Sequence, residues 1–242
     1  MRLPRVYTKE YLTPGSEIDL ESGAAHYVSS VLRLSTGDDV ILFNGRGGEY
    51  SATLGRAKKG KARVHVNHFH DVNRESPIRI HLYQGLSRGD RMDLAIQKAT
   101  ELGVASITPI LCQHVQFKGG EQRRKNKMQH WQHIIVNAAQ QCRRCELPTL
   151  NPVTPLPDAL SQTNETTTLF VHPSTQQKLA KNLKDIASIA VFIGPEGGFS
   201  EAECQMAVKH KAHVIQLGPR ILRTETATVA TLSLIQFLFG DI

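Results

Sequence analysis

Two short apolar runs in this sequence end in the same way, and this repeated pattern constrains the fold more than any other feature. Residues 188–193 lead into Gly-Pro-Glu-Gly-Gly at 194–198, and residues 214–217 lead into Gly-Pro-Arg at 218–220. Short β-branched runs bounded by glycine and proline predict buried strands, and a residue before a proline is held extended. Each strand should therefore continue to its glycine and then turn sharply.

A helix is predicted after each of these turns. The capping box Ser200-Glu201-Ala202-Glu203 begins the first helix, and an apolar helix over 226–239 follows the second turn. Strand–loop–helix units of this kind form parallel sheets, which bind ligands where the loops leave the carboxyl ends of the strands. Because Glu196, Arg223 and Glu225 lie on these loops, a binding or catalytic site is favoured over two ordinary strand ends.

The two turns together resemble a known protein family. Phe192–Gly198 and Leu217–Ala227, which reads Leu-Gly-Pro-Arg-Ile-Leu-Arg-Thr-Glu-Thr-Ala, are similar to motifs of the ribosomal RNA small subunit methyltransferase E family, within the SPOUT superfamily. Three further motifs match: Ser87–Gly89, Lys98–Gly103 and Phe170–Pro173. The resemblance implies an enzyme with a C-terminal trefoil knot, which transfers a methyl group from S-adenosylmethionine to N3 of one uridine in 16S ribosomal RNA.

The chain is expected to form two domains, residues 1–73 and 74–242. The first reads as five short strands and one helix, enough for a small β-barrel, and the resemblance identifies it as a PUA-like RNA-binding domain. The second alternates strands with helices, which predicts an α/β domain with a mostly parallel sheet. Strands are expected at 2–7, 17–20, 39–43, 49–54, 62–69, 78–83, 107–111, 168–171, 188–193 and 214–217. Helices are expected at 22–34, 90–102, 122–144, 157–161, 175–186, 200–211 and 226–239.

The resemblance also implies which residues bind S-adenosylmethionine. Backbone groups of three loops are expected to hold it: His172, Pro173, Gly194, Pro195, Glu196, Gly197, Gly198, Leu217, Gly218, Ile221 and Leu222. Uridine N3 carries a proton at neutral pH, so its methylation needs a base or a cation that stabilises the resulting oxyanion. Arg223 is the expected stabiliser, because its guanidinium keeps its charge and donates two parallel hydrogen bonds. Glu196 and Glu225 both stay open as the base, and either also fits a structural role.

Charge and composition bear on the partners. The chain has 29 Lys and Arg against 22 Asp and Glu, and its net charge of +7 favours a polyanionic partner. The N-terminus lacks an apolar signal core, and no run is long enough to cross a membrane, so a cytoplasmic protein is expected. RNA contacts are expected at Arg5, Arg33, Arg88, Lys98 and Arg124. The resemblance implies 16S ribosomal RNA or the small ribosomal subunit as partner.

The same resemblance implies a homodimer. The last predicted helix has small residues at three-residue spacing, Ala227, Ala230 and Ser233, which would permit the close approach of another helix. A shared interface of this kind would complete each active site.

Two other motifs do not support a function. Residues 55–61 approach a phosphate-binding P-loop, but Ala62 replaces the required Ser or Thr, and a strand follows where a helix is needed. Cys142 and Cys145 lie at the far end of the predicted helix that carries His130, about three turns away, so no metal site is expected.

Two alternative functions remain open at this point. The chain could be a related knotted methyltransferase that acts on another RNA. It could also be a non-catalytic RNA-binding or ribosome-assembly protein, in which the barrel acts and the α/β domain is a spacer. Binding of S-adenosylmethionine would separate the second alternative from the first.

Overall fold

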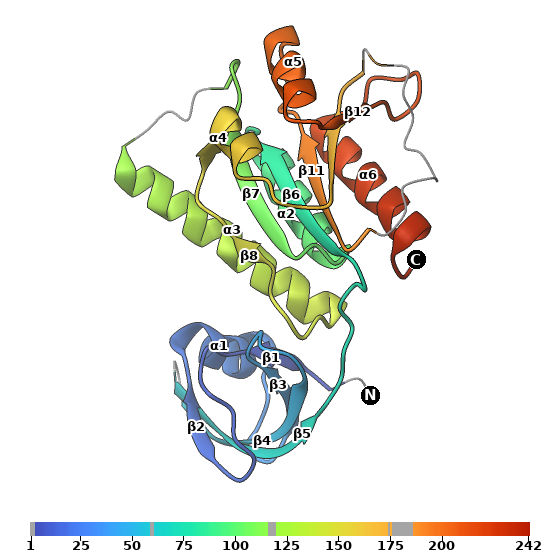
Figure 1. The fold of residues 1–242 in the computed structure, drawn as a ribbon. Coiled ribbons are helices and arrows are strands. Elements are labelled where there is room, and N and C mark those ends of the chain that lie inside the picture. The colour runs from blue at the N-terminus through green and yellow to red at the C-terminus, as the bar shows by residue number, and fades with distance from the viewer. Residues whose placement is uncertain (1–2, 59–60, 116–119, 174, 176–185) are drawn as a thin grey trace. The chain divides into compact units, whose positions relative to one another are not determined.

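The computed structural model describes residues 3–58, 61–115, 120–173, 175 and 186–242, and the chain divides into two compact units (Figure 1). Unit 1 comprises residues 1–75 and 136–147, and unit 2 comprises residues 76–135 and 148–242. The long helix α3 (Glu121–Cys142) therefore begins in unit 2 and ends in unit 1. No local sequence pattern indicates that residues 136–147 belong to unit 1.

Unit 1 is built on a five-stranded sheet in the order β1-β3-β4-β5-β2. The strands are β1 (Arg5–Tyr7), β2 (Glu17–Leu20), β3 (Asp39–Phe43), β4 (Glu49–Lys58) and β5 (Lys61–His70). Register shifts between β4 and β5 mark bulges, which bend and twist a strand pair. The strands expected at 17–20 and 39–43 have those bounds. The helix expected at 22–34 is shorter, an α-helix α1 (Ser22–His26) continued by a π-helical turn η1 (Tyr27–Val31).

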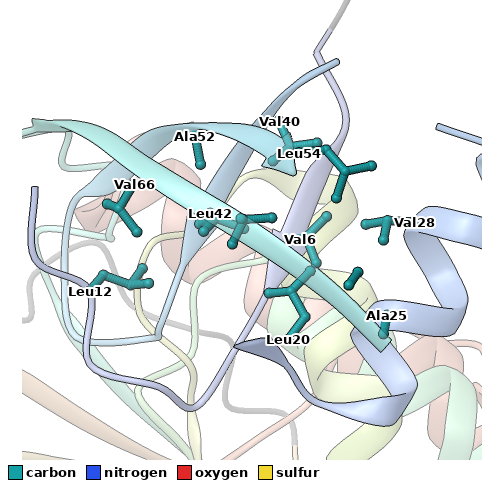
Figure 2. Close-up of a cluster of buried hydrophobic side chains, with 12 residues drawn as sticks. Val6, Leu12, Leu20, Ala25, Val28, Val40, Leu42, Ala52, Leu54 and Val66 are labelled. Carbon is teal, nitrogen blue, oxygen red and sulfur yellow. The ribbon is translucent and has the colours of Figure 1, made fainter. Parts of the chain in front are cut away.

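The core of unit 1 follows from alternation along the strands. Ala62, Val64 and Val66 of β5 are buried while their neighbours face outward, which is the two-residue period of a half-buried strand. They pack with Val6 of β1 and Val28 of η1 in one apolar cluster (Figure 2). The short helical segment is thus held to the sheet by apolar contact.

Arg5 has a structural position in unit 1, which corrects its expected role in RNA binding. Its side chain is only 7% exposed, and its Nε donates to Glu49 Oε2 at 3.0 Å. Its two terminal nitrogens donate to the carbonyl oxygens of Ala139 and Arg144, at 3.0 and 2.8 Å. The guanidinium also lies 3.9 Å from the centre of the Phe43 ring. Arg5 therefore attaches residues 136–147 to the sheet and has no free donor face for RNA.

Glu49 is the anion at the centre of this contact. It accepts from Arg74 as well as from Arg5, at 3.2 Å from Arg74 Nη1. Burial alone would raise the pKa of Glu49, but the hydrogen bonds from Arg74 and Arg5 outweigh it and hold the pKa below its usual value. A second pair, Arg144 with Glu75, secures the same segment at 2.6 Å.

Unit 2 contains a parallel sheet in the order β12-β10-β11-β6-β7-β8, with β9 paired to β7. Every strand pair described in this unit is parallel. The strands are β6 (Arg79–Gly85), β7 (Ser106–Leu111), β8 (Thr149–Leu150), β9 (Thr154–Pro155), β10 (Thr167–Val171), β11 (Ser188–Ile193) and β12 (His213–Ile215). The expected α/β class is confirmed. The two-residue strands β8 and β9 were not predicted, because they are too short to show a period.

The helices of unit 2 cover this sheet. They are α2 (Asp90–Glu101), α4 (Leu156–Ser161), α5 (Glu201–Lys209), α6 (Thr224–Phe239) and the first part of α3. Met92, Ile96 and Ala99 of α2 are buried as predicted, while Leu102 is only half-buried. Helix α2 packs against α6. The helix expected at 175–186 falls almost entirely outside the described residues. In the part of the chain that the structure describes, no helix has both the length and the apolar character of a membrane span.

A substitution at Arg5 tests its structural role. Arg5→Met should lower the free energy of unfolding by roughly 2–4 kcal/mol, because Glu49 loses one buried partner and two carbonyls lose their donor. Chemical denaturation measures this change. Arg33→Met is the matched control, because Arg33 is exposed, and its effect should stay within about 0.5 kcal/mol. Equal, small effects of both substitutions would show that the Arg5 contacts contribute nothing to stability.

Candidate functional site

The two Gly-Pro turns meet at one cavity of about 520 Å³ in unit 2. The parallel pairing of β10, β11 and β12 brings their carboxyl ends to one edge of the sheet, and the first turn of α6 joins them there. All of the residues expected to bind the cofactor line this cavity: His172, Pro173, Gly194, Pro195, Glu196, Gly197, Gly198, Leu217, Gly218, Ile221 and Leu222. Arg223 and Glu225 line it too. The structure thus brings together segments more than 50 residues apart.

Two glycines show why this edge excludes side chains. A Cβ atom on Gly85, at the end of β6, would lie 2.7 Å from the carbonyl carbon of Gly194 and would also overlap Pro195. No side chain fits there, so the end of β6 and the 194–195 turn pack backbone to backbone. Gly218 has φ of +82°, a left-handed conformation that other residues rarely adopt. The end of β6 and the turn at 218 therefore require glycine for geometric reasons.

Hydrogen bonds fix the loops against one another. Gln216 Nε2 donates to the carbonyl oxygen of Pro173 at 3.0 Å, which joins the loop after β12 to the loop after β10. Ser200 and Glu203 form the predicted capping box of α5. The buried carboxylate of Glu203 also accepts from the backbone N–H of Gln113 at 2.7 Å. Glu203 therefore connects the loop after β7 to the start of α5.

Glu196 is held by two donors from the segment that follows β6. Its Oε1 accepts from the backbone N–H of Arg88 at 2.9 Å and from Arg91 Nη1 at 3.0 Å. Burial would raise the pKa of this carboxyl, but these bonds and one from its own backbone N–H outweigh burial and lower the pKa. A lowered pKa makes Glu196 a weaker base and a stronger anchor for the turn.

Glu225 has a different environment in the first turn of α6. Among the described residues, none donates a hydrogen bond to its Oε2 atom, which is buried at the cavity. A buried carboxylate oxygen without a donor is costly unless another group binds there. Arg223, the N-cap residue of α6, is exposed at the same cavity. An acceptor and a cation thus lie two residues apart at one wall.

The remaining candidates for RNA contact lie outside the cavity lining. Arg88 is exposed, and its backbone already bonds Glu196. Lys98 pairs with Glu101 one turn along α2, at 2.9 Å. Arg124 on α3 and Arg33, two residues after η1, are exposed, and Arg33 has φ of +54°. Arg33, Arg88 and Arg124 are thus exposed and Lys98 is half-buried, whereas Arg5 is buried.

Sequence reasoning missed several residues of the site. Arg91, Phe199 and Thr224 line the cavity but were not among the candidates. The position of Arg91, in the first turn of the helix that follows β6, was a usable signal, because that turn starts from the same edge of the sheet. The role of Thr224 depends on tertiary contacts that no local pattern encodes.

The cysteine pair noted in the sequence has a structural setting. The Cys145 thiol is buried beside Arg5, and burial raises its pKa. Within the described residues, no group of three or more His, Cys, Asp and Glu side chains is arranged to hold a metal ion.

The cavity suits a ligand that is held mainly by hydrogen bonds to backbone N–H and C=O groups of the protein. Glycine-lined turns present N–H and C=O groups, and a cavity of this volume is within the range of small-molecule sites. The unpartnered carboxylate oxygen of Glu225 can accept a hydrogen bond or a proton, and Arg223 can stabilise a developing anion.

Family models match both units of the chain. The model described as an RNA methyltransferase domain matches residues 74–236, and the model described as an RNA methyltransferase PUA domain matches residues 20–67.

Relatives of known name are similar over almost their whole length. The ribosomal RNA small subunit methyltransferase E of Buchnera aphidicola subsp. Schizaphis graminum is 32% identical, with 100% of this chain and 98% of the relative covered. The protein of the same name from Bacillus subtilis is 29% identical, with 95% and 93% covered.

Solved structures with bound cofactor are also similar. A candidate methyltransferase of Legionella pneumophila, in complex with SAM, has a TM-score of 0.97 at 37% identity, and 100% of each chain is covered. A ribosomal RNA small subunit methyltransferase E from Neisseria gonorrhoeae, bound to S-adenosyl methionine, has a TM-score of 0.92 at 33% identity, again with 100% of each chain covered.

The lowered pKa of Glu196 predicts a pH-dependent contribution to stability. Because the folded pKa lies below the unfolded value of about 4.5, the contribution is complete above that value and is lost as pH falls through the folded pKa. Glu196→Gln should therefore lower the melting temperature most at neutral pH, and the difference from the unsubstituted protein should shrink below about pH 4. Thermal unfolding across this pH range measures it. A difference that does not vary with pH would rule out this role for the carboxylate.

Proposed function

This chain belongs to the ribosomal RNA small subunit methyltransferase E family, and from that premise we propose that it methylates N3 of one uridine in 16S ribosomal RNA, with S-adenosylmethionine as methyl donor. The observation that carries the proposal is the cavity where both Gly-Pro turns meet the first turn of α6. Relatives solved with this cofactor support the choice of donor. Uridine N3 is the part of the proposal that rests on the family resemblance.

The residues of the cavity fit the cofactor. S-adenosylmethionine, when bound, supplies an activated methyl group, so the protein mainly has to position the reactants and exclude water. Backbone groups of residues 194–198 and 217–222 would hold its polar parts, and Ile193 and Phe199 provide apolar contact. Gln216 and Pro173 keep two of the loops together around it.

The two candidate carboxylates take separate roles. Glu225 is the better acceptor for the N3 proton of uridine, because its buried Oε2 has no donor among the described residues. Glu196 already accepts two hydrogen bonds from the segment after β6 and has a lowered pKa, so it anchors the turn. Arg223, exposed at the cavity, would stabilise the negative charge that develops on a uracil oxygen.

RNA binding is shared between the units in this proposal. Unit 1 contains the segment that matches the PUA model, and its exposed Arg33 is a candidate contact. Arg88, Lys98 and Arg124 are the candidates in unit 2. Phosphate contacts position an RNA without reading its sequence. The target uridine must reach the cavity single-stranded or extruded, in free 16S ribosomal RNA or in the small ribosomal subunit, and the cytoplasm is the proposed location.

A homodimer and a C-terminal knot belong to the same proposal. Leu234 and Phe237 of α6 are 43% and 67% exposed, a large apolar exposure that a second copy would cover. Ala227 is already buried within its own unit, so the expected small-residue contact would use Ala230 and Ser233, which are half-buried. Light scattering would detect the dimer, and a monomer at working concentration would contradict it. An experimental trace of the complete backbone would test the knot.

Methyl transfer to isolated 16S ribosomal RNA and to small subunits tests the activity directly. We expect incorporation of labelled methyl groups into one of these substrates, and mass mapping should place the group on N3 of a single uridine. Methylation of transfer RNA or of a ribose hydroxyl instead would favour a related methyltransferase on another RNA. Calorimetric titration that detects no binding of S-adenosylmethionine would favour a non-catalytic RNA-binding protein.

Substitutions at the wall of the cavity test the assigned roles. Arg223→Ala and Glu225→Gln should each lower the rate of methyl transfer by at least ~100-fold while cofactor affinity stays nearly unchanged, the scale of losing one charge-stabilising donor or a general base. Lys209→Ala, an exposed charge change on α5, is the control for general effects. Near-normal turnover in either cavity variant would remove that residue from the mechanism.

A further inference from the structure

A fully buried glutamine lies behind the wall of the cavity. Gln84 is on β6, between Ile193 of β11 and Pro109 of β7, and its side chain is 0% exposed. An amide offers two donors and an acceptor, and each needs a partner when it is buried. The partners of Gln84 therefore show what this residue holds in place.

Both the nitrogen and the oxygen of the Gln84 side-chain amide form hydrogen bonds with the first two turns of α6. Its Nε2 donates to Thr224 Oγ1 at 2.9 Å, with a longer contact of 3.3 Å to the carbonyl oxygen of Gly85. Its Oε1 accepts from Thr228 Oγ1 at 2.6 Å. Thr224 and Thr228 are themselves buried, so water does not compete for these bonds.

The hydroxyl of Thr224 continues the chain of bonds to the 194–198 turn. Thr224 Oγ1 donates to the carbonyl oxygen of Gly194 at 2.6 Å. A hydroxyl has one proton and a carbonyl only accepts, so Thr224 must accept from the Gln84 nitrogen. With the amide nitrogen toward Thr224 and its oxygen toward Thr228, the one hydroxyl proton of Thr228 is shared between Gln84 Oε1 at 2.6 Å and the carbonyl oxygen of Thr224 at 2.9 Å.

Helix α6 depends on these bonds at its start. Its N-cap residue, Arg223, makes no capping hydrogen bond with its side chain, whereas α5 begins with a complete capping box. Without a cap, the first turn of α6 is held by Thr224, which bonds Gln84 on one side and Gly194 on the other. Arg223 and Glu225 flank Thr224, so a shift of this turn moves both at the cavity.

We propose that Gln84 is a positioning residue for the methyl transfer. It acts through Thr224 and Thr228, and it sets the place of Arg223 and Glu225 relative to the Gly194 turn without touching the ligand. This inference rests on the proposed function, because its effect is on the rate of that reaction. Misplacement of reacting groups by about 1 Å is enough to lower a rate by ~100-fold.

Gln84→Met tests the proposal, because methionine keeps the length of the side chain and removes its hydrogen bonds. At saturating cofactor and RNA, we expect kcat to fall by about 10- to 100-fold while KM for RNA stays within about twofold. Gln236→Met is the matched control. Gln236 is a similarly buried glutamine of unit 2 that does not line the cavity. Its side-chain amide accepts a hydrogen bond from Ser76 and donates one to the carbonyl oxygen of Leu102.

The comparison of the two methionine variants separates positioning from stability. If both lose activity in proportion to their loss of melting temperature, Gln84 has only a structural role and the proposal fails. If Gln84→Met keeps normal kcat, the proposal also fails. An unsubstituted protein that transfers no methyl group would instead overturn the proposed function, so the two failures are distinguishable.

Thr228 provides a second test that does not depend on the folding of the Gln84 variant. Thr228→Val keeps the shape and removes the hydroxyl, so kcat should fall by about fivefold or more, and Thr228→Ser should recover most of it. In the double variant with Gln84→Met, the losses should combine to less than their product, because both partners of one buried bond are removed. Independent losses, or a valine variant with normal kcat, would contradict the proposal.

Discussion

Parallel pairing of β6, β10, β11 and β12 is the constraint on which the rest of unit 2 depends. Parallel strands end at the same edge, so the turns at 194–198 and 216–222 leave the sheet at one edge, on either side of the end of β10. The first turn of α6 reaches that edge as well, with backbone N–H groups that have no partner within the helix. The cavity therefore arises from topology before any side chain contributes to it.

Two kinds of contact hold that edge of the sheet in place: close backbone packing and buried hydrogen bonds. At Gly85 the absence of a side chain lets β6 contact the Gly194–Pro195 backbone directly. One residue earlier, Gln84 fills a buried position with an amide whose hydrogen bonds are all used. Apolar packing alone fixes distance but not orientation, whereas buried hydrogen bonds are directional and costly to leave unmade. A site that must align a donor methyl group with a base benefits from the second kind of contact.

The excess of positive charge has several separate uses. Arg5, Arg74 and Arg144 form buried or partly buried pairs within unit 1 and hold residues 136–147. Arg91 anchors Glu196, and Arg223 stays exposed at the cavity. Net charge predicted a polyanionic partner, but it could not distinguish these roles. Burial and hydrogen-bond partners separate them, because an arginine whose donors are already bonded has little left to offer to RNA.

The sequence by itself determined the α/β class, most of the strands and helices of unit 2, and many of the residues that line the cavity. It could do so because β-branched runs, Gly-Pro turns and the Ser200–Glu203 capping box are local signals. Only the tertiary structure decided that Arg5 is buried, that Glu196 accepts two hydrogen bonds while Glu225 Oε2 has no donor among the described residues, and that residues 136–147 join unit 1. These outcomes depend on contacts between residues far apart in the chain. The partners of Gln84 are 140 and 144 positions away, and no local pattern specifies such pairs.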